Sequence, residues 1–204
     1  MPLVSDYFDN LNSIQKEQFA RLDKIYPQIN NLVNLVSRKD IDNLTIHHVL
    51  HSLAIAKVIN FERGQKILDI GTGGGFPGIP LAIMFPDVQF LLVDSIGKKI
   101  EAVKTIAIEL GLKNVTTLQA RVEDVPGGYN WAVCRAVGRL DKVWPLVKDK
   151  VARGGLIYLK GGDYSQEIPV NIEIKSWPIA KIFPEIDFFE TKYVLLLKSK
   201  KISA

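Results

Sequence analysis

The sequence predicts an α/β fold with a mostly parallel sheet, a closing antiparallel hairpin and a helical N-terminal extension. Three observations lead to this prediction. Apolar strands alternate with helical stretches of roughly 10–15 residues from position 65 onward, which is typical of a parallel sheet covered by helices on both faces. A glycine-rich loop follows the first of these strands. The last two extended segments, 170–183 and 192–198, have no convincing helix between them, so we expect them to pair as a hairpin.

The N-terminal part, residues 1–62, is expected to form a helical cap in the same globule as the α/β domain, residues 63–204. Apolar residues recur at helical spacing over 5–25, with a serine at the start as N-cap. Pro27 predicts that this helix ends before it. A second helix with an apolar face is expected over about 45–59. No low-complexity linker separates the two parts.

In the α/β domain the expected elements follow in a regular order. A buried strand is expected at KILDIG (66–71), and further strands at VQFLLVD (88–94), VTTLQA (115–120), WAVCRA (131–136) and LIYLKG (156–161). Helices are expected at PLAIMF (80–85), KKIEAVKTIAIELG (98–111) and from about Leu140 to Ala152, where Gly154 and Gly155 predict the end.

The composition excludes several classes of protein. The 204 residues are 47% hydrophobic and 24% charged, which excludes a mostly disordered chain. No apolar run approaches the roughly 20 residues that a membrane helix needs, and the first residues lack a signal-peptide pattern. Cys134 is the single cysteine, so no internal disulfide can form. We therefore expect a cytoplasmic protein, without a membrane partner and monomeric.

The glycine-rich loop is the strongest functional signal. Asp69 lies near the end of a predicted strand, and the glycines that follow let the backbone turn tightly and approach a ligand. Asp94 ends the next strand, where a carboxylate can accept hydrogen bonds from ribose hydroxyls. The sequence therefore predicts a site for a nucleoside cofactor.

Two cofactors compete for this loop. Residues 73–78 fit the G-x-G-x-x-G pattern of dinucleotide-binding proteins. Pro77 and Pro80, however, remove N–H groups that a pyrophosphate would need, and Asp69 adds negative charge beside it. S-adenosylmethionine carries a cationic amino group and a sulfonium, so it suits the loop better. The pattern D-x-G-x-G-x-G with a later acid resembles the loop of Rossmann-like class I methyltransferases, whose sheet also closes with an antiparallel hairpin.

A narrower resemblance covers roughly residues 30–162. The segments LDIGTGGGFPGIPLAI, VDSIGKKIEAVK, QARVEDV, CRAVGRL and YLKGG, in this order, resemble the glucose-inhibited division protein B family, also called ribosomal RNA small subunit methyltransferase G. The resemblance implies S-adenosylmethionine-dependent methylation of N7 of one guanine in 16S rRNA, in the loop conventionally numbered 527. Either the RNA or the small-subunit particle would then be the partner. Two positions depart from the family pattern, since His51 stands where an aspartate is usual and Gly74 where a proline is common.

The resemblance also implies site residues. The cofactor-binding residues would be Asp69, Gly71, Gly73, Gly75, Phe76, Asp94, Ser95, Ile96, Val122, Glu123 and Arg135. Within this set, the glycines and Phe76 would line the methionine end, and Asp94 would hold the ribose. Arg135 would face both the cofactor and the incoming base, and it is the one candidate catalytic residue. No general base is expected, because guanine N7 has a free lone pair.

Basic residues are expected to contact RNA. Residues 1–94 hold 8 Lys and Arg against 10 Asp and Glu, whereas residues 95–204 hold 18 against 12. The candidates at the ligand-binding ends of the predicted strands are Lys98, Lys99, Arg135, Arg139 and Lys160. A solvated lysine-rich face would explain the same charge pattern.

Other chemistry has weaker support. His47 and His51 are spaced for a zinc site, but no third ligand accompanies them, so we expect no metal. The sequence does not assign a role to His47, His48 or His51, for which packing or a place at the rim of a site is expected. A nucleophilic Cys134 lacks the Pro-Cys context of pyrimidine C5 methylation and is expected to be structural. Two rival functions stay open, an NAD(P)-dependent reductase and a non-catalytic ribosome- or RNA-binding module.

Overall fold

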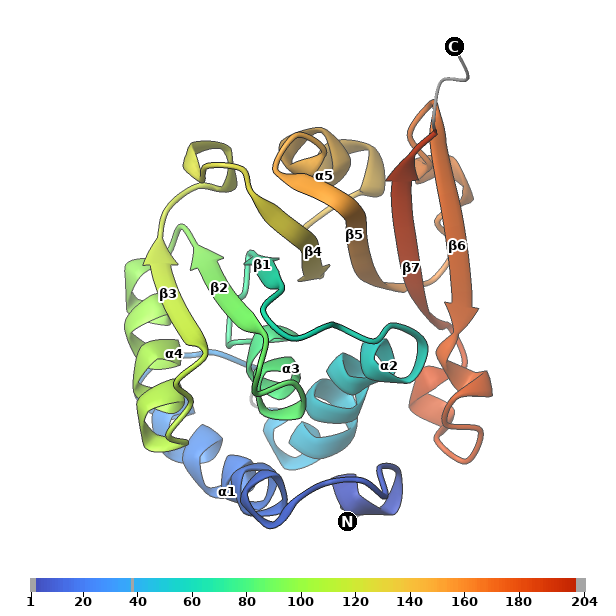
Figure 1. Ribbon diagram of the computed structural model, residues 1–204. Helices are drawn as coiled ribbons and strands as arrows, with labels where there is room; N and C mark the ends of the chain where they lie inside the picture. The colour runs from blue at the N-terminus through green and yellow to red at the C-terminus, as the bar shows by residue number, and fades with distance from the viewer. Residues whose placement is uncertain (1–2, 38, 201–204) are drawn as a thin grey trace.

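A seven-stranded sheet forms the centre of the computed structural model, which describes residues 3–37 and 39–200 (Figure 1). The ends of the predicted cap and domain, at 1–2 and 201–204, and position 38 lie outside these ranges. The strands are β1 Lys66–Ile70, β2 Gln89–Asp94, β3 Val115–Gln119, β4 Tyr129–Arg135, β5 Val151–Gly161, β6 Ile172–Pro178 and β7 Lys192–Ser199. Their order in the sheet is β3-β2-β1-β4-β5-β7-β6.

The first five strands pair in parallel, whereas β7 is antiparallel to both of its neighbours. The mostly parallel sheet with a closing antiparallel hairpin is therefore confirmed. Strand β7 enters between β5 and β6, so the hairpin does not simply extend the sheet edge.

Helices cover both faces of the sheet. They are α1 Ser13–Asn30, α2 His51–Val58, α3 Gly78–Met84, α4 Gly97–Glu109 and α5 Leu140–Val147. A π-helical segment, Thr45–Leu50, leads directly into α2. Helices α1 to α4 lie on one face and α5 on the other (Figure 1). Within the described ranges, every helix is too short or too polar to cross a bilayer.

Alternating side chains of the strands build one core on each face. In β4, Val133 belongs to the cluster under α1–α4, whereas Ala132 and Cys134 belong to the cluster under α5. The first cluster also contains Phe19 and Leu22 of α1, which are buried together with residues of the sheet. That residues 1–62 and 63–204 form a single globule stays a prediction.

The boundaries of α1 differ from the prediction. The helix begins at Ser13, since the side chain of Asn12 accepts a hydrogen bond from the Gln15 amide at 2.9 Å and Gln15 reciprocates. The predicted end before Pro27 is wrong, because the helix continues to Asn30 with the proline inside. The residue before the proline, Tyr26, is fully buried, and its burial offsets the hydrogen bond that the proline cannot donate.

The predicted extension of α5 to residue 152 is also wrong, because β5 begins at Val151. Gly154 and Gly155 lie within the strand and do not end a helix. A Cβ atom on Gly154 would stand 2.3 Å from the Trp131 ring, and one on Gly155 would stand 2.3 Å from the Leu197 carbonyl oxygen. The glycines are therefore required for close approach of the neighbouring strands.

Candidate functional site

The glycine loop joins β1 to α3 and turns sharply at three glycines. Gly71, Gly73 and Gly75 have φ values of +60°, +58° and +88°, which favour glycine. Asp69 lies beneath the loop, fully buried, and its Oδ2 accepts hydrogen bonds from the Thr72 hydroxyl at 2.6 Å and the Gly78 amide at 2.9 Å. Burial raises the pKa of this carboxyl to about 7. Asp69 therefore fixes the shape of the loop through hydrogen bonds from its buried side.

Asp94 at the end of β2 links the glycine loop to the β2–α4 loop. Its Oδ2 accepts a hydrogen bond from the Gly73 amide at 2.9 Å, and its Oδ1 accepts one from the Ile96 amide at 2.9 Å. Each carboxylate oxygen retains a second lone pair for a ligand hydroxyl. Ser95 and Ile96 are exposed beside it, and 42% of Ile96 is accessible.

The other predicted cofactor residues lie near the C-terminal ends of the parallel strands or are buried beneath the glycine loop. Val122 and Glu123 form a 3-10 turn after β3, half-buried and exposed respectively. The Ala120 amide, just before this turn, donates to the Asp94 carbonyl at 3.1 Å, which brings the turn beside the β2 end. Phe76 is buried and packs against Tyr26, with ring centroids 4.9 Å apart.

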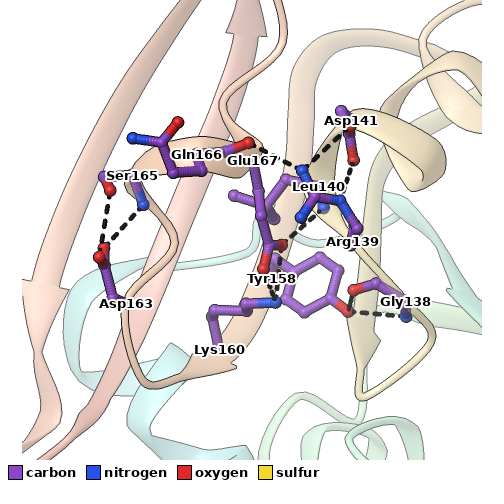
Figure 2. Close-up of polar contacts among 10 residues, drawn as sticks. All are labelled: Gly138, Arg139, Leu140, Asp141, Tyr158, Lys160, Asp163, Ser165, Gln166 and Glu167. Atoms are coloured by element: carbon purple, nitrogen blue, oxygen red, sulfur yellow. Dashed lines mark hydrogen bonds and ion pairs between the residues drawn. The ribbon is translucent and has the colours of Figure 1, made fainter.

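The β4–α5 loop lies against the glycine loop. A Cβ atom on Gly71 would stand 2.8 Å from the Val137 side chain, so the two loops are in close contact. Figure 2 shows that the Tyr158 hydroxyl binds Gly138 twice, accepting from its amide at 3.1 Å and donating to its carbonyl at 2.7 Å. Ala136 has a φ of 55°, an uncommon conformation for a residue other than glycine. The loop is thus held in one strained arrangement next to the candidate cofactor loop.

Arg135, the last residue of β4, joins the sheet to the N-terminal helices. Its Nη1 donates to the His47 carbonyl at 3.1 Å, its Nη2 lies 2.8 Å from His48 Nδ1, and its guanidinium lies 5.1 Å from the Phe76 ring centroid. Burial lowers the pKa of Arg135 to about 10, which still leaves the side chain charged at neutral pH. These contacts could not be predicted from the sequence, since no local pattern connects β4 with residues near position 47.

A pocket of about 520 Å³ opens at the ends of β4 and β5. All three histidines line this pocket, together with Arg135 and with Phe188, which lies close to the C-terminal strand β7 in the sequence. His48 and His51 are buried, whereas His47 is half-buried and stacks on Phe188 with a centroid distance of 3.8 Å. Sequence reasoning missed this pocket because its walls come from three separate parts of the chain, 40–51, 135–161 and 188–192.

Two of the predicted RNA-binding residues are engaged by the protein itself (Figure 2). Lys160 forms an ion pair with Glu167 at 2.7 Å, and both side chains are largely buried. Arg139 donates to the Gln166 carbonyl at 2.8 Å and pairs with Asp141 at 3.1 Å. Sequence reasoning missed Glu167, which also accepts a hydrogen bond from the Leu140 amide.

The predicted basic residues do not form one cluster. Lys160 and Arg135 both line the pocket, whereas Lys98 and Lys99 lie in the first turn of α4, after β2. Strands β1 and β4 separate β2 from β5 in the sheet. Lys98 is exposed and Lys99 is half-buried.

Two further alternatives are a nucleophilic cysteine and a metal site. Cys134 is fully buried, and burial raises the pKa of its thiol well above the usual value, so it is not poised as a nucleophile. In the part of the chain that the structure describes, His, Cys, Asp and Glu side chains do not gather in groups of three or more that could hold a metal ion.

Solved structures share this fold at low sequence identity. A mutant of MtNAS in complex with S-adenosylmethionine matches 92% of this chain and 76% of its own, with a TM-score of 0.61 and 15% identity. A SAM dependent methyltransferase from Aquifex aeolicus matches 79% of this chain and 98% of its own, with a TM-score of 0.52 and 16% identity. The chain therefore shares its fold with a SAM dependent methyltransferase and with a protein solved in complex with S-adenosylmethionine.

Sequence comparison is more specific. The family model described as GidB, rRNA small subunit methyltransferase G, matches residues 15–180. A protein of Christiangramia forsetii named ribosomal RNA small subunit methyltransferase G is 47% identical over 207 residues, covering 98% of each chain. Agreement at this level along nearly the whole length shows that the chain belongs to the GidB family of rRNA small subunit methyltransferases G.

Proposed function

We propose that the protein transfers a methyl group from S-adenosylmethionine to N7 of a guanine in 16S rRNA of the small ribosomal subunit, in the loop conventionally numbered 527. The observation that carries the proposal is the identity with a ribosomal RNA small subunit methyltransferase G over 98% of the chain. The same proposal places the protein in the cytoplasm, where ribosomes are assembled, as a monomer.

The glycine loop fits S-adenosylmethionine. A Cβ atom on Gly73 would find only the Gly71 carbonyl oxygen, at 3.9 Å, so the loop leaves open space on this side. We assign Gly71, Gly73 and Gly75 to the methionine end and Asp94 to the ribose, with Ser95, Ile96 and the Val122–Glu123 turn near the adenine. Asp69 and Phe76 support the loop from its buried side.

The start of α3 disfavours the dinucleotide alternative. The Gly78 amide donates to Asp69 at 2.9 Å, and the Ile79 amide donates to the Gly75 carbonyl at 2.7 Å. Pro77 and Pro80 have no N–H group. A pyrophosphate would therefore lack the free amides that a helix N-terminus supplies in dinucleotide-binding proteins.

The reaction places modest demands on the protein. When bound, S-adenosylmethionine supplies a methyl group on a sulfonium; the N7 lone pair forms the new C–N bond while the electron pair of the broken C–S bond stays on sulfur. No proton moves, so a general base is not required. The side chains must align the base and exclude water. Arg135, held between the His47 carbonyl and His48, is suited to orient groups around the base.

Two measurements test the proposed function. Small-subunit particles from a strain lacking the enzyme are incubated with labelled S-adenosylmethionine, and the modified nucleotide is mapped. Label at N7 of a single guanine supports the proposal, whereas binding without transfer to any small-subunit RNA favours a non-catalytic binding module. Calorimetric titration with S-adenosylmethionine and with NADPH addresses the reductase, since binding of NADPH alone would refute a methyltransferase.

A further inference from the structure

The pocket beside Arg135 lies next to the candidate cofactor loop. Ala136 and Gly138 line the pocket, and Val137 between them contacts Gly71. The β4–α5 loop is therefore a shared wall, with the glycine loop on one side and the pocket on the other. Its volume of about 520 Å³ is within the usual range for small-molecule sites and exceeds the needs of one nucleobase.

Two buried histidine nitrogens at this pocket have no hydrogen-bond partner among the described residues. These atoms are Nε2 of His48 and Nε2 of His51, whose residues are 8% and 6% exposed. Leaving a buried polar group unpaired costs about 1–3 kcal/mol. Both residues line the pocket, and a ligand that reaches these buried nitrogens would supply the missing partner.

Arg135 determines which nitrogen of His48 carries the proton. A guanidinium can only donate, so His48 Nδ1, 2.8 Å from Arg135 Nη2, must accept. In a neutral imidazole the proton then lies on Nε2. Burial lowers the pKa of His48 to about 3, so the ring is neutral at physiological pH. His48, a residue of the pocket wall, thus carries a fixed N–H donor, and because this nitrogen is buried a ligand reaches it only when a side chain of the wall moves.

The rim of the pocket suits a flat, electron-rich group attached to a polyanion. His47 stacks on Phe188 with an interplanar angle of 13°. Lys192 Nζ lies 3.9 Å from the Phe188 ring centroid and also lines the pocket. Aromatic rings and cations together are typical of sites that hold a base splayed out of an RNA stack.

A fixed donor discriminates between purines. Guanine has the O6 acceptor where adenine has the N6 amino donor, while both have N7 as an acceptor. We propose that this pocket holds the target guanine, turned out of the RNA, and that His48 Nε2 donates a hydrogen bond to guanine O6. Arg135 is then a positioning residue that fixes the His48 tautomer. The inference rests on the proposed function, because it names the substrate subsite of that reaction.

The first test removes O6 from the substrate. Particles or RNA carrying 2-aminopurine at the target position keep N7 and the 2-amino group but lose O6. Wild-type enzyme should methylate them at least about tenfold more slowly than guanine, by kcat/KM, while inosine, which keeps O6, should be a substrate. In the His48→Phe variant the guanine preference over 2-aminopurine should shrink toward one. An unchanged preference in a folded variant would overturn the role of His48.

A second test does not depend on any variant folding. RNA with 6-thioguanosine at the target position is irradiated with wild-type enzyme, and the cross-linked peptides are mapped by mass spectrometry. Cross-links within residues 45–58 or 187–192 support the pocket. Cross-links confined to other surfaces, such as α4 near Lys98, would overturn it.

Two lysines of the closing hairpin provide a test substitution and its matched control. Lys192→Met removes a cation at the pocket rim and should raise KM for RNA several-fold without changing S-adenosylmethionine affinity. Lys175→Met removes a cation that lies 4.8 Å from the Trp177 ring, outside the pocket lining, and should leave KM unchanged. Equal effects would refute a specific rim contact.

Wild-type enzyme that methylates no small-subunit RNA would refute the proposed function itself. Efficient methylation with cross-links elsewhere would refute only the pocket.

Discussion

The substitution Gly73→Ala is expected to weaken cofactor binding strongly while it lowers the stability of the fold only a little. The φ of +58° costs an alanine about 1–2 kcal/mol, while the added Cβ meets no protein atom closer than 3.9 Å. The free energy of unfolding should therefore fall only by this amount. The methyl group points into the space that we assign to S-adenosylmethionine, so affinity should fall at least tenfold, which corresponds to about 1.4 kcal/mol of binding free energy.

Gly64→Ala is the matched control. Gly64 has a φ of +79°, and a Cβ atom there would meet nothing within 4 Å, so the backbone cost is similar. This glycine precedes β1, at the end of the strand opposite the glycine loop. Urea unfolding measures stability and calorimetric titration measures affinity. If Gly73→Ala binds S-adenosylmethionine as tightly as Gly64→Ala, the placement of the cofactor over this loop is refuted.

Three further predictions concern charged side chains. Asp69 has a folded pKa of about 7 against an ordinary 3.8, so the folded state holds a proton that the unfolded chain releases. The free energy of unfolding should therefore fall by up to about 4 kcal/mol as pH rises from 4 to 7. In urea titrations the Asp69→Asn variant should show a flatter dependence of stability on pH. An equal pH dependence in both proteins would contradict the raised pKa of Asp69. Arg135→Ala leaves two acceptors unpaired and should cost about 1–3 kcal/mol of stability, with a larger loss of turnover that single-turnover assays detect. Unchanged turnover would remove Arg135 from the site. Glu167→Gln frees Lys160, so RNA binding measured by anisotropy should tighten and depend more steeply on salt. An unchanged salt slope would show that Lys160 contacts no phosphate.

The sequence predicts the sheet well because its signals are local. Every parallel strand except β3 contains a short apolar run, and the glycine-rich loop lies between a strand and a helix. The exact limits of helices depend on distant contacts. Pro27 stays inside α1 because its buried neighbours pack on the sheet, and Gly154 lies inside β5 because the Trp131 ring approaches it.

The candidate site is only partly predictable for the same reason. The glycine loop and Asp94 follow two consecutive strands, so their type and spacing are sufficient to predict them as parts of one site. The contact of Arg135 with His48 spans 87 residues and leaves no local pattern. The ion pair of Lys160 with Glu167 is likewise a product of folding, so the sequence alone overstates how many basic side chains are free for RNA.

The position of β7 determines the order in which the site can be assembled during synthesis. A ribosome delivers β5 and β6 before β7, yet β7 lies between them, so β6 can join the sheet only after Lys192–Ser199 emerges. Only a chain extended past Phe188 can bring that ring against His47. The glycine loop that we propose for the methyl donor is therefore encoded early, and the pocket that we propose for the base is completed last.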